Sequence, residues 1–136
     1  MSMAGGCLCG SVRYEVEGEP LVTAVCHCRD CQKQTGTSFS IVMGLPTSAL
    51  KVSGQTSVFT TQGQSGAGVQ RNFCGKCGSP IFSAPDAAPG LVFLKAGTLD
   101  NPANLKPQLN CWCETKQDWV TVDSALPVFP QNPPMG

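Results

Sequence analysis

Residues 73–80 read FCGKCGSP, and this stretch decides the fold because two cysteines three residues apart, each followed by glycine, are typical of a zinc knuckle. Glycine at these positions lets backbone amides turn toward the sulfur atoms and stabilise their negative charge. A thiolate site needs four ligands, and residues 5–11, GGCLCGS, contain a second cysteine pair. We therefore predict a closed structural zinc site whose ligands are Cys7, Cys9, Cys74 and Cys77. The alternative is that these four are ordinary buried or redox-active thiols.

A third cluster lies between the two pairs. Residues 26–31 read CHCRDC, so Cys26, Cys28 and Cys31 supply three sulfur ligands without an adjacent fourth. Structural zinc sites have four protein ligands, whereas catalytic sites keep one position open. We therefore favour an open site at this cluster, which accepts a substrate thiolate or water.

Two alternatives concern the fourth ligand of this cluster. His27 would point away from its neighbouring cysteines in an extended segment, so a role beside the ligands or at the surface is favoured over ligation. Cys111 and Cys113 form another pair two residues apart. If either of them completed the cluster, both metal sites would be structural.

Composition limits the classes of partner. The 136 residues suit one domain, 1–136, and nine Lys plus Arg balance nine Asp plus Glu, so the chain has no broad attraction for nucleic acid or anionic lipid. No stretch of about 18 apolar residues predicts a membrane span, and the first residues do not resemble an export signal. We therefore expect a soluble, cytoplasmic protein with reduced cysteines.

The segments between the fifteen glycines and eleven prolines mostly alternate apolar and polar residues, which predicts a mainly β fold of short antiparallel strands. In 11–17, Val12, Tyr14 and Val16 should face the core. A short helix is expected over 29–34, ended by Thr35 and Gly36, with a loop over 61–68 and a loose tail over 130–136. The predicted strands are 11–17, 21–26, 38–43, 57–61, 69–73, 80–83, 91–96 and 110–113.

Several motifs together resemble one family. GGCLCGSVRYEVEGEP (5–20), CHCRDCQKQTGTSF (26–39), RNFCGKCGSPIF (71–82), GTLDNP (97–102) and a closing LPVF (126–129) are similar in order and spacing to the glutathione-dependent formaldehyde-activating enzymes, also called the CENP-V/GFA domain family. The resemblance covers nearly the whole chain and implies the zinc-binding, mainly β fold called Mss4-like or β-tent. It also implies structural zinc ligands Cys7, Cys9, Cys74 and Cys77, and catalytic zinc ligands Cys26, Cys28 and Cys31.

The same resemblance implies a carbon–sulfur lyase that joins or cleaves a small-molecule thiol, glutathione in the family, and a small aldehyde such as formaldehyde. Two zinc ions per chain are expected. Zinc at the open site would favour the deprotonated thiol and hold it beside the carbonyl carbon. Arg29, Lys33 and Arg71 are candidates to meet carboxylates of a glutathione-like substrate. The competing hypothesis is a zinc-stabilised binding module without catalysis, in which both metals are structural.

Overall fold

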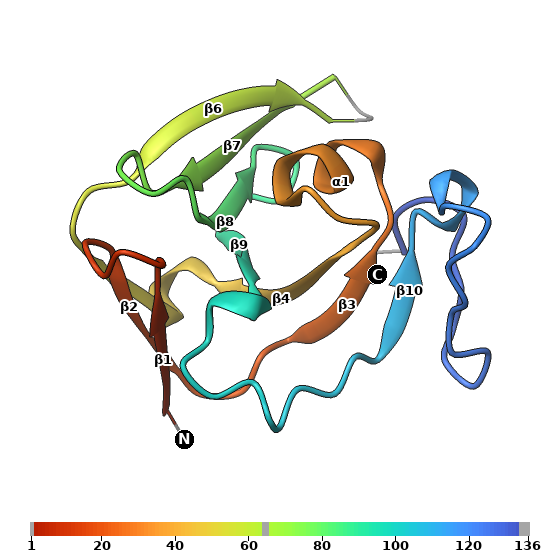
Figure 1. Cartoon of the computed structure of the whole chain (residues 1–136), viewed down its shortest axis with the longest axis horizontal. Coiled ribbons are helices and arrows are strands. Elements are labelled where there is room, and N and C mark those ends of the chain that lie inside the picture. Colours follow the sequence, from red (N-terminus) through yellow and green to blue (C-terminus); the bar gives the residue numbers. More distant parts are fainter. Residues whose placement is uncertain (1, 64–65, 134–136) are drawn as a thin grey trace.

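The computed structural model describes residues 2–63 and 66–133, which form two packed β-sheets and one short α-helix. A three-stranded sheet has the order β1-β2-β5, and a seven-stranded sheet has the order β10-β3-β4-β9-β8-β7-β6. In Figure 1, the small sheet lies at one side of the molecule and β10 at the other, with α1 between them. The fold is therefore mainly β, as the sequence predicts.

The elements have the following bounds. The helix α1 covers Arg29–Thr35. Short 3-10 turns cover Thr47–Ala49, Ala96–Thr98 and Cys113–Thr115. The strands are β1 (Ser2–Gly6), β2 (Arg13–Glu17), β3 (Val22–Cys26), β4 (Ser40–Pro46), β5 (Leu50–Ser53), β6 (Ser57–Gln62), β7 (Gly68–Phe73), β8 (Pro80–Pro85), β9 (Leu91–Lys95) and β10 (Leu109–Cys111).

The main core lies between the two sheets. Val12, Tyr14 and Val16 alternate with exposed charged residues along β2 and are at most 2% exposed, which confirms the predicted buried face. They pack in one cluster with apolar side chains of the large sheet, such as Met43 and Leu94. A second, smaller cluster contains cysteines and lies beside β3 and β10.

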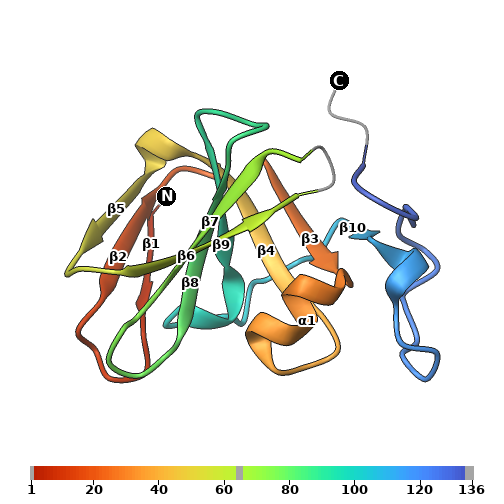
Figure 2. The same ribbon diagram turned by 90° about the horizontal axis from the view of Figure 1, so that it is seen from above.

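The helix α1 begins and ends as its sequence predicts. Cys28 occupies the N-cap, where its sulfur accepts a hydrogen bond from the Cys31 N–H at 3.2 Å. Gly36 ends the helix with a φ of 71°, a left-handed conformation that glycine adopts without steric strain. Figure 2 shows α1 at one end of the large sheet, near β3 and β4.

Some predicted elements differ from the structure. All eight predicted strands exist, but the sequence analysis missed β1 and β5. β1 has no apolar alternation, and β5 is only four residues long and mostly exposed. The strand predicted over 110–113 ends at Cys111 because Trp112 adopts a left-handed conformation with a φ of 57°. β10 also pairs with β3 in parallel, unlike the expected antiparallel arrangement. The predicted loop over 61–68 includes 64–65, which lie outside the described residues.

The C-terminal segment runs beside β10. The Trp112 and Glu114 N–H groups donate to the carbonyl oxygens of Gln131 and Pro130 at 3.1 and 3.2 Å. Of the predicted loose tail 130–136, residues 134–136 lie outside the described residues. In the described part of the chain, no helix combines the length and the apolar character needed to cross a membrane.

Candidate metal centres

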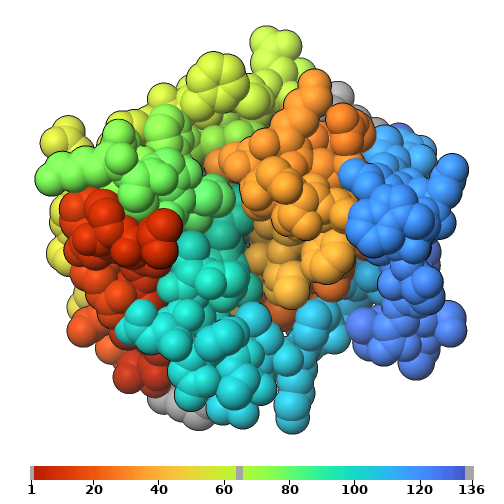
Figure 3. Space-filling view, in the orientation of Figure 1, coloured from red at the N-terminus to blue at the C-terminus, as the bar shows by residue number. Residues whose placement is uncertain are grey.

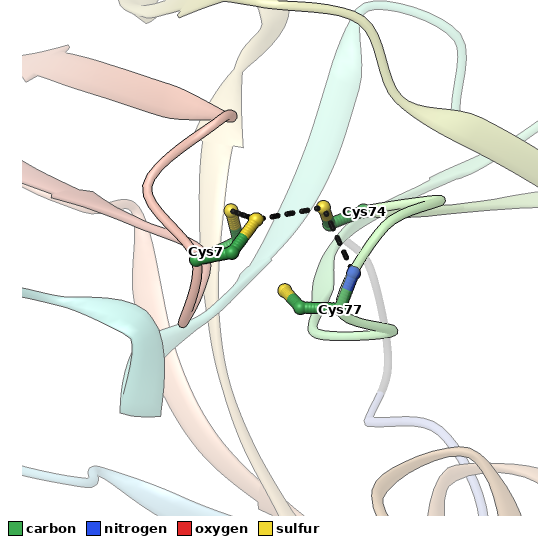
Figure 4. A group of neighbouring side chains, drawn as sticks. Cys7, Cys74 and Cys77 are labelled. Atoms are coloured by element: carbon green, nitrogen blue, oxygen red, sulfur yellow. Dashed lines mark hydrogen bonds between the residues drawn. The ribbon is translucent and has the colours of Figure 1, made fainter.

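The first cysteine group joins two turns that are far apart in the sequence. Cys7 and Cys9 lie in the turn between β1 and β2, whereas Cys74 and Cys77 lie in the turn between β7 and β8. Their four sulfur atoms all lie within 4.8 Å of one another. Figure 4 shows Cys7, Cys74 and Cys77 approaching from the two turns with their sulfur atoms directed toward a common point. The group therefore connects the small sheet to the large sheet.

The sulfur separations suit a tetrahedral zinc ion. The Cys7 and Cys9 sulfur atoms are 3.6 Å apart, and those of Cys9 and Cys74 are 3.7 Å apart. A tetrahedron with Zn–S bonds of ~2.3 Å has edges of about 3.8 Å, whereas a disulfide bond is about 2.05 Å long. All nine cysteines are free thiols in the structure. The donor set of this group therefore fits zinc.

Hydrogen bonds favour the ionised form of two thiols in this group, Cys7 and Cys77. The Val12 N–H donates to the Cys7 sulfur at 3.2 Å, and the Lys76 N–H donates to the Cys74 sulfur at 3.4 Å. Burial opposes ionisation of Cys7, but the bond from Val12 and those with neighbouring thiols and Ser11 lower its pKa to about 7. A hydrogen bond with the Ser79 hydroxyl, together with backbone bonds, lowers the pKa of Cys77 to about 5.

The second cysteine group lies where β3 leads into α1. Cys26 ends β3, Cys28 caps the helix, and Cys31 lies in its first turn. The three sulfur atoms lie within 4.8 Å of one another, and those of Cys26 and Cys31 are 3.7 Å apart. All three thiols therefore belong to one short segment, and the same spacing argument supports a zinc ion held by three thiolates.

In the second group, the surroundings favour a negative charge on the Cys31 sulfur atom. Hydrogen bonds with Cys26 and Cys28 lower the pKa of Cys31, and the positive charges of Lys95 and Arg71 lower it further. The pKa of Cys26 is raised, first through its contact with Cys111 and then through Cys31. Metal binding must therefore displace protons from the other thiols.

His27 lies beside the second cysteine group, which is one of the two positions that the sequence analysis favoured. Its side chain is 1% exposed, which excludes the predicted surface role. The ring packs against Phe39 with centroids 5.7 Å apart, and burial lowers its pKa, an effect that Asn110 partly offsets. No nitrogen atom of His27 lies close enough to the sulfur atoms to join either group of possible ligands. Its imidazole therefore lies beside the second site without completing it.

Cys111 and Cys113 diverge because the backbone turns between them. Cys111 is buried opposite Cys26 in the parallel strand pair and packs with it in one buried cluster. The left-handed Trp112 sends Cys113 into a 3-10 turn, where it is half-buried and its N–H donates to the Phe129 carbonyl oxygen. Among the described residues, the group of mutually close sulfur atoms contains only Cys26, Cys28 and Cys31.

Two cavities flank α1, and basic side chains line both. One, of about 360 Å³, is lined in part by Arg29 and Lys33. The other, of about 380 Å³, is lined in part by Lys33, Arg71 and Phe59. The Arg71 guanidinium donates to Thr61 and Gln34 at 3.0 Å, so its side chain is held in place at 11% exposure. In Figure 3, α1 and the turn after it (orange) lie between the C-terminal region (blue) and β6–β8 (green).

Lys95 is the main site residue that the sequence analysis missed. It ends β9, is 4% exposed, and its ammonium group donates to the Ser40 hydroxyl at 3.0 Å and lies 3.9 Å from the Cys31 sulfur. A lysine at the end of a predicted strand carries no sequence signal of burial. Ser11 and Ser79 were also missed; their hydroxyls lie 3.1 Å from the Cys9 sulfur and 3.3 Å from the Cys77 sulfur, respectively.

Comparisons with known proteins agree with these observations. The model of the family described as "Glutathione-dependent formaldehyde-activating enzyme" matches residues 2–115. A protein of Halomonas elongata named "Putative glutathione-dependent formaldehyde-activating enzyme" is 30% identical over 131 residues, which cover 91% of this chain and 83% of that protein.

Two further relatives extend the comparison. A Talaromyces marneffei protein with the same name is 32% identical over 107 residues, which cover 75% of this chain and 57% of that protein, so the match spans little more than half of that relative. A crystal structure of a Rhodobacter sphaeroides protein matches with a TM-score of 0.57 at 24% identity, over 77% of this chain and 92% of that chain. The structural likeness supports the mainly β fold.

Proposed function

This chain belongs to the glutathione-dependent formaldehyde-activating enzyme family, and from this membership we propose that it is a zinc-dependent carbon–sulfur lyase. The reaction joins a small-molecule thiol of the glutathione type to a small aldehyde such as formaldehyde, or cleaves their adduct. The observation that carries the proposal is the unequal division of cysteines into a group of four and a group of three. The first group suits a closed structural site and the second an open catalytic site.

The proposal assigns a role to each group. Cys7, Cys9, Cys74 and Cys77 hold a structural zinc ion, and Cys26, Cys28 and Cys31 hold a catalytic one. We further propose that 1–136 is one domain and that the protein is cytoplasmic. Its partners would then be small molecules rather than nucleic acid or membranes. The balanced charge of the chain supports the choice of small-molecule partners.

The proposed reaction forms one carbon–sulfur bond and moves one proton. Bound zinc supplies positive charge that favours the deprotonated form of a thiol. The thiol sulfur forms a bond to the carbonyl carbon, the thiol loses its proton, and the carbonyl oxygen gains one, so the addition is balanced. Three thiolate ligands donate more charge to the ion than histidines would, which suits activation of a thiol better than activation of water.

The residues around α1 support a charged thiol substrate. Lys33 lines both cavities beside the helix, with Arg29 in one and Arg71 in the other. Guanidinium groups pair with carboxylates through two parallel hydrogen bonds, and glutathione carries two carboxylates. We propose that these three side chains orient the tail of the thiol while the second cysteine group holds its reacting end.

Replacement of the catalytic ligands tests the function. In Cys28→Ser or Cys31→Ser, we expect no formation of the thiol–aldehyde adduct, measured by product formation from glutathione and formaldehyde above the uncatalysed rate. Cys113→Ser is the matched control, because it removes a half-buried thiol outside both groups and should keep full activity. Wild-type rates in Cys28→Ser and Cys31→Ser would rule out the proposed site.

One observation favours a second candidate function, a binding module in which both metals are structural. Cys111 is buried, pairs with Cys26 across the two strands and packs in the same cluster, so it is the candidate fourth ligand. Cobalt substitution separates the two proposals. An open site should change its thiolate-to-cobalt absorption when a free thiol is added, whereas a site closed by Cys111 should not respond.

A further inference from the structure

Lys95 reaches the second cysteine group through the register of three strands. Cys26 on β3 pairs with Ser40 on β4, and Val42, two residues further along β4, pairs with Lys95 on β9. Paired residues share a face of a sheet, and so do residues two apart in one strand. Cys26, Ser40 and Lys95 therefore occupy the face on which α1 places Cys31.

The ammonium group of Lys95 is buried against sulfur. It donates to the Ser40 hydroxyl at 3.0 Å and lies 3.9 Å from the Cys31 sulfur, while the residue as a whole is 4% exposed. In the described part of the chain, the two ion pairs are Arg13 with Asp100 and Arg71 with Asp30, so neither compensates Lys95. A lysine is rarely buried to this extent unless an opposite charge lies near it. The cysteine group is therefore the counter-charge of Lys95.

The positive charge of Lys95 affects which ligand the metal at the second site would accept. A divalent ion with three thiolates has one net negative charge, and an anionic fourth ligand raises this to two. In a partly buried site, where charges are weakly screened, a second negative charge is costly. The fixed positive charge of Lys95 offsets part of that cost, whereas a neutral ligand gains little from it.

We propose that Lys95 is a positioning residue that gives the open coordination site its preference for a thiolate over a neutral fourth ligand. Ser40 holds the ammonium group in place through the 3.0 Å hydrogen bond. The inference rests on the proposed function in one respect, because it takes Cys26, Cys28 and Cys31 as the ligands of an open metal site.

The test compares two ligands on the cobalt-substituted full-length protein. 2-Mercaptoethanol is the thiol, because its uncharged tail does not engage Arg29, Lys33 or Arg71, and imidazole is the neutral ligand. In Lys95→Met, we expect the dissociation constant of the thiol to rise at least about tenfold, while that of imidazole changes less than about twofold. Lys95→Arg, which keeps the charge, should restore most of the affinity for the thiol. Changes in the cobalt absorption bands give both constants without any measurement of turnover.

The outcomes separate this inference from the proposed function. Equal affinity for the thiol in wild type and Lys95→Met, or an equal loss of thiol and imidazole binding, would overturn the role of Lys95 even if the wild type turns over glutathione and formaldehyde. A thiol-selective loss supports the role of Lys95 even if the wild type has no lyase activity. If Lys95→Met does not fold, Ser40→Ala provides the same comparison. We expect a smaller loss of thiol affinity in this variant, with imidazole affinity unchanged. An unchanged thiol affinity would count against the proposal.

Discussion

Tyr14 shows how a single side chain links the local pattern of β2 to the packing of the two sheets. It is the only tyrosine in the chain, it is 2% exposed, and its hydroxyl lies 2.7 Å from the Thr98 hydroxyl. Burial of the phenol disfavours its charged form and raises its pKa, although the hydrogen bond with Thr98 opposes this shift. The tyrosine therefore reports directly on the main core.

The raised pKa of Tyr14 predicts a pH dependence of stability. Because the folded pKa lies above the unfolded value of about 10, the neutral phenol contributes its full stability below pH 10 and loses it as pH rises through the folded pKa. Tyrosinate absorbance near 295 nm should titrate above pH 10 in the folded protein and near pH 10 in denaturant. Tyr14→Phe should remove the absorbance change and the associated alkaline loss of stability. A folded-state midpoint at or below pH 10 would contradict the buried phenol.

At the scale of elements, β1 is positioned by the close approach of its backbone to β2 and to the turn after β9, because its sequence has no apolar alternation. β1 pairs with β2 along its whole length, and its residue Gly5 forms a bridge with Leu99. A Cβ atom on Gly5 would lie 2.3 Å from the Tyr14 hydroxyl oxygen and 2.4 Å from the Thr98 carbonyl oxygen. Glycine is therefore needed where β1 passes the 3-10 turn after β9.

This contact predicts the effect of one added methyl group. Gly5→Ala should lower the free energy of unfolding by about 2 kcal/mol, because the Thr98 backbone cannot move aside without disturbing the end of β9. Gly97→Ala is the matched control, since its Cβ would have no heavy atom within 4 Å, and it should change stability by less than about 0.5 kcal/mol. Urea denaturation of both variants measures the difference. Equal effects would show that β1 tolerates a side chain at this point.

At the scale of the whole molecule, the first cysteine group connects the two sheets. The Cys9 and Cys74 sulfur atoms come from residues 65 apart in sequence and lie 3.7 Å from each other. Structural zinc sites in small peptides contribute roughly 10–16 kcal/mol near neutral pH, whereas a whole domain is stable by about 5–15 kcal/mol. A zinc ion held by these four sulfur atoms would therefore contribute enough free energy to decide whether the chain folds.

The two metal groups should differ in their effect on stability. Cys74→Ser should abolish soluble, cooperatively folding protein, whereas Cys28→Ser should retain a cooperative thermal transition, because the second group lies within one segment beside α1. Treatment of the wild type with a strong chelator should reproduce the Cys74→Ser result once both ions are removed. Circular dichroism during heating measures the stability of each sample, and the metal content of each sample is determined in parallel. A Cys74→Ser variant as stable as Cys28→Ser would contradict the structural role of the first group.

The features that the sequence alone determined are those that the geometry of a short backbone segment controls. The alternation of Val12, Tyr14 and Val16 predicts the buried face of β2, since successive strand side chains point to opposite faces. Gly36 predicts the end of α1 because it adopts a positive φ without strain. The cysteine spacings and the family resemblance also predict one group of four cysteines and one of three, and the sulfur atoms of each group lie close together in the structure. Their role as zinc ligands stays a prediction.

Which distant segments lie together depends on the packing of the whole chain. Lys95 has the local pattern of a strand-end surface residue, yet the pairing of β3, β4 and β9 buries it against Cys31, 64 residues away. Cys111 and Cys113 have the spacing of a ligand pair, yet the left-handed Trp112 separates them. Strand register and single backbone conformations of this kind depend on packing across the whole molecule, because the free energy that selects them comes from contacts between residues far apart in the chain.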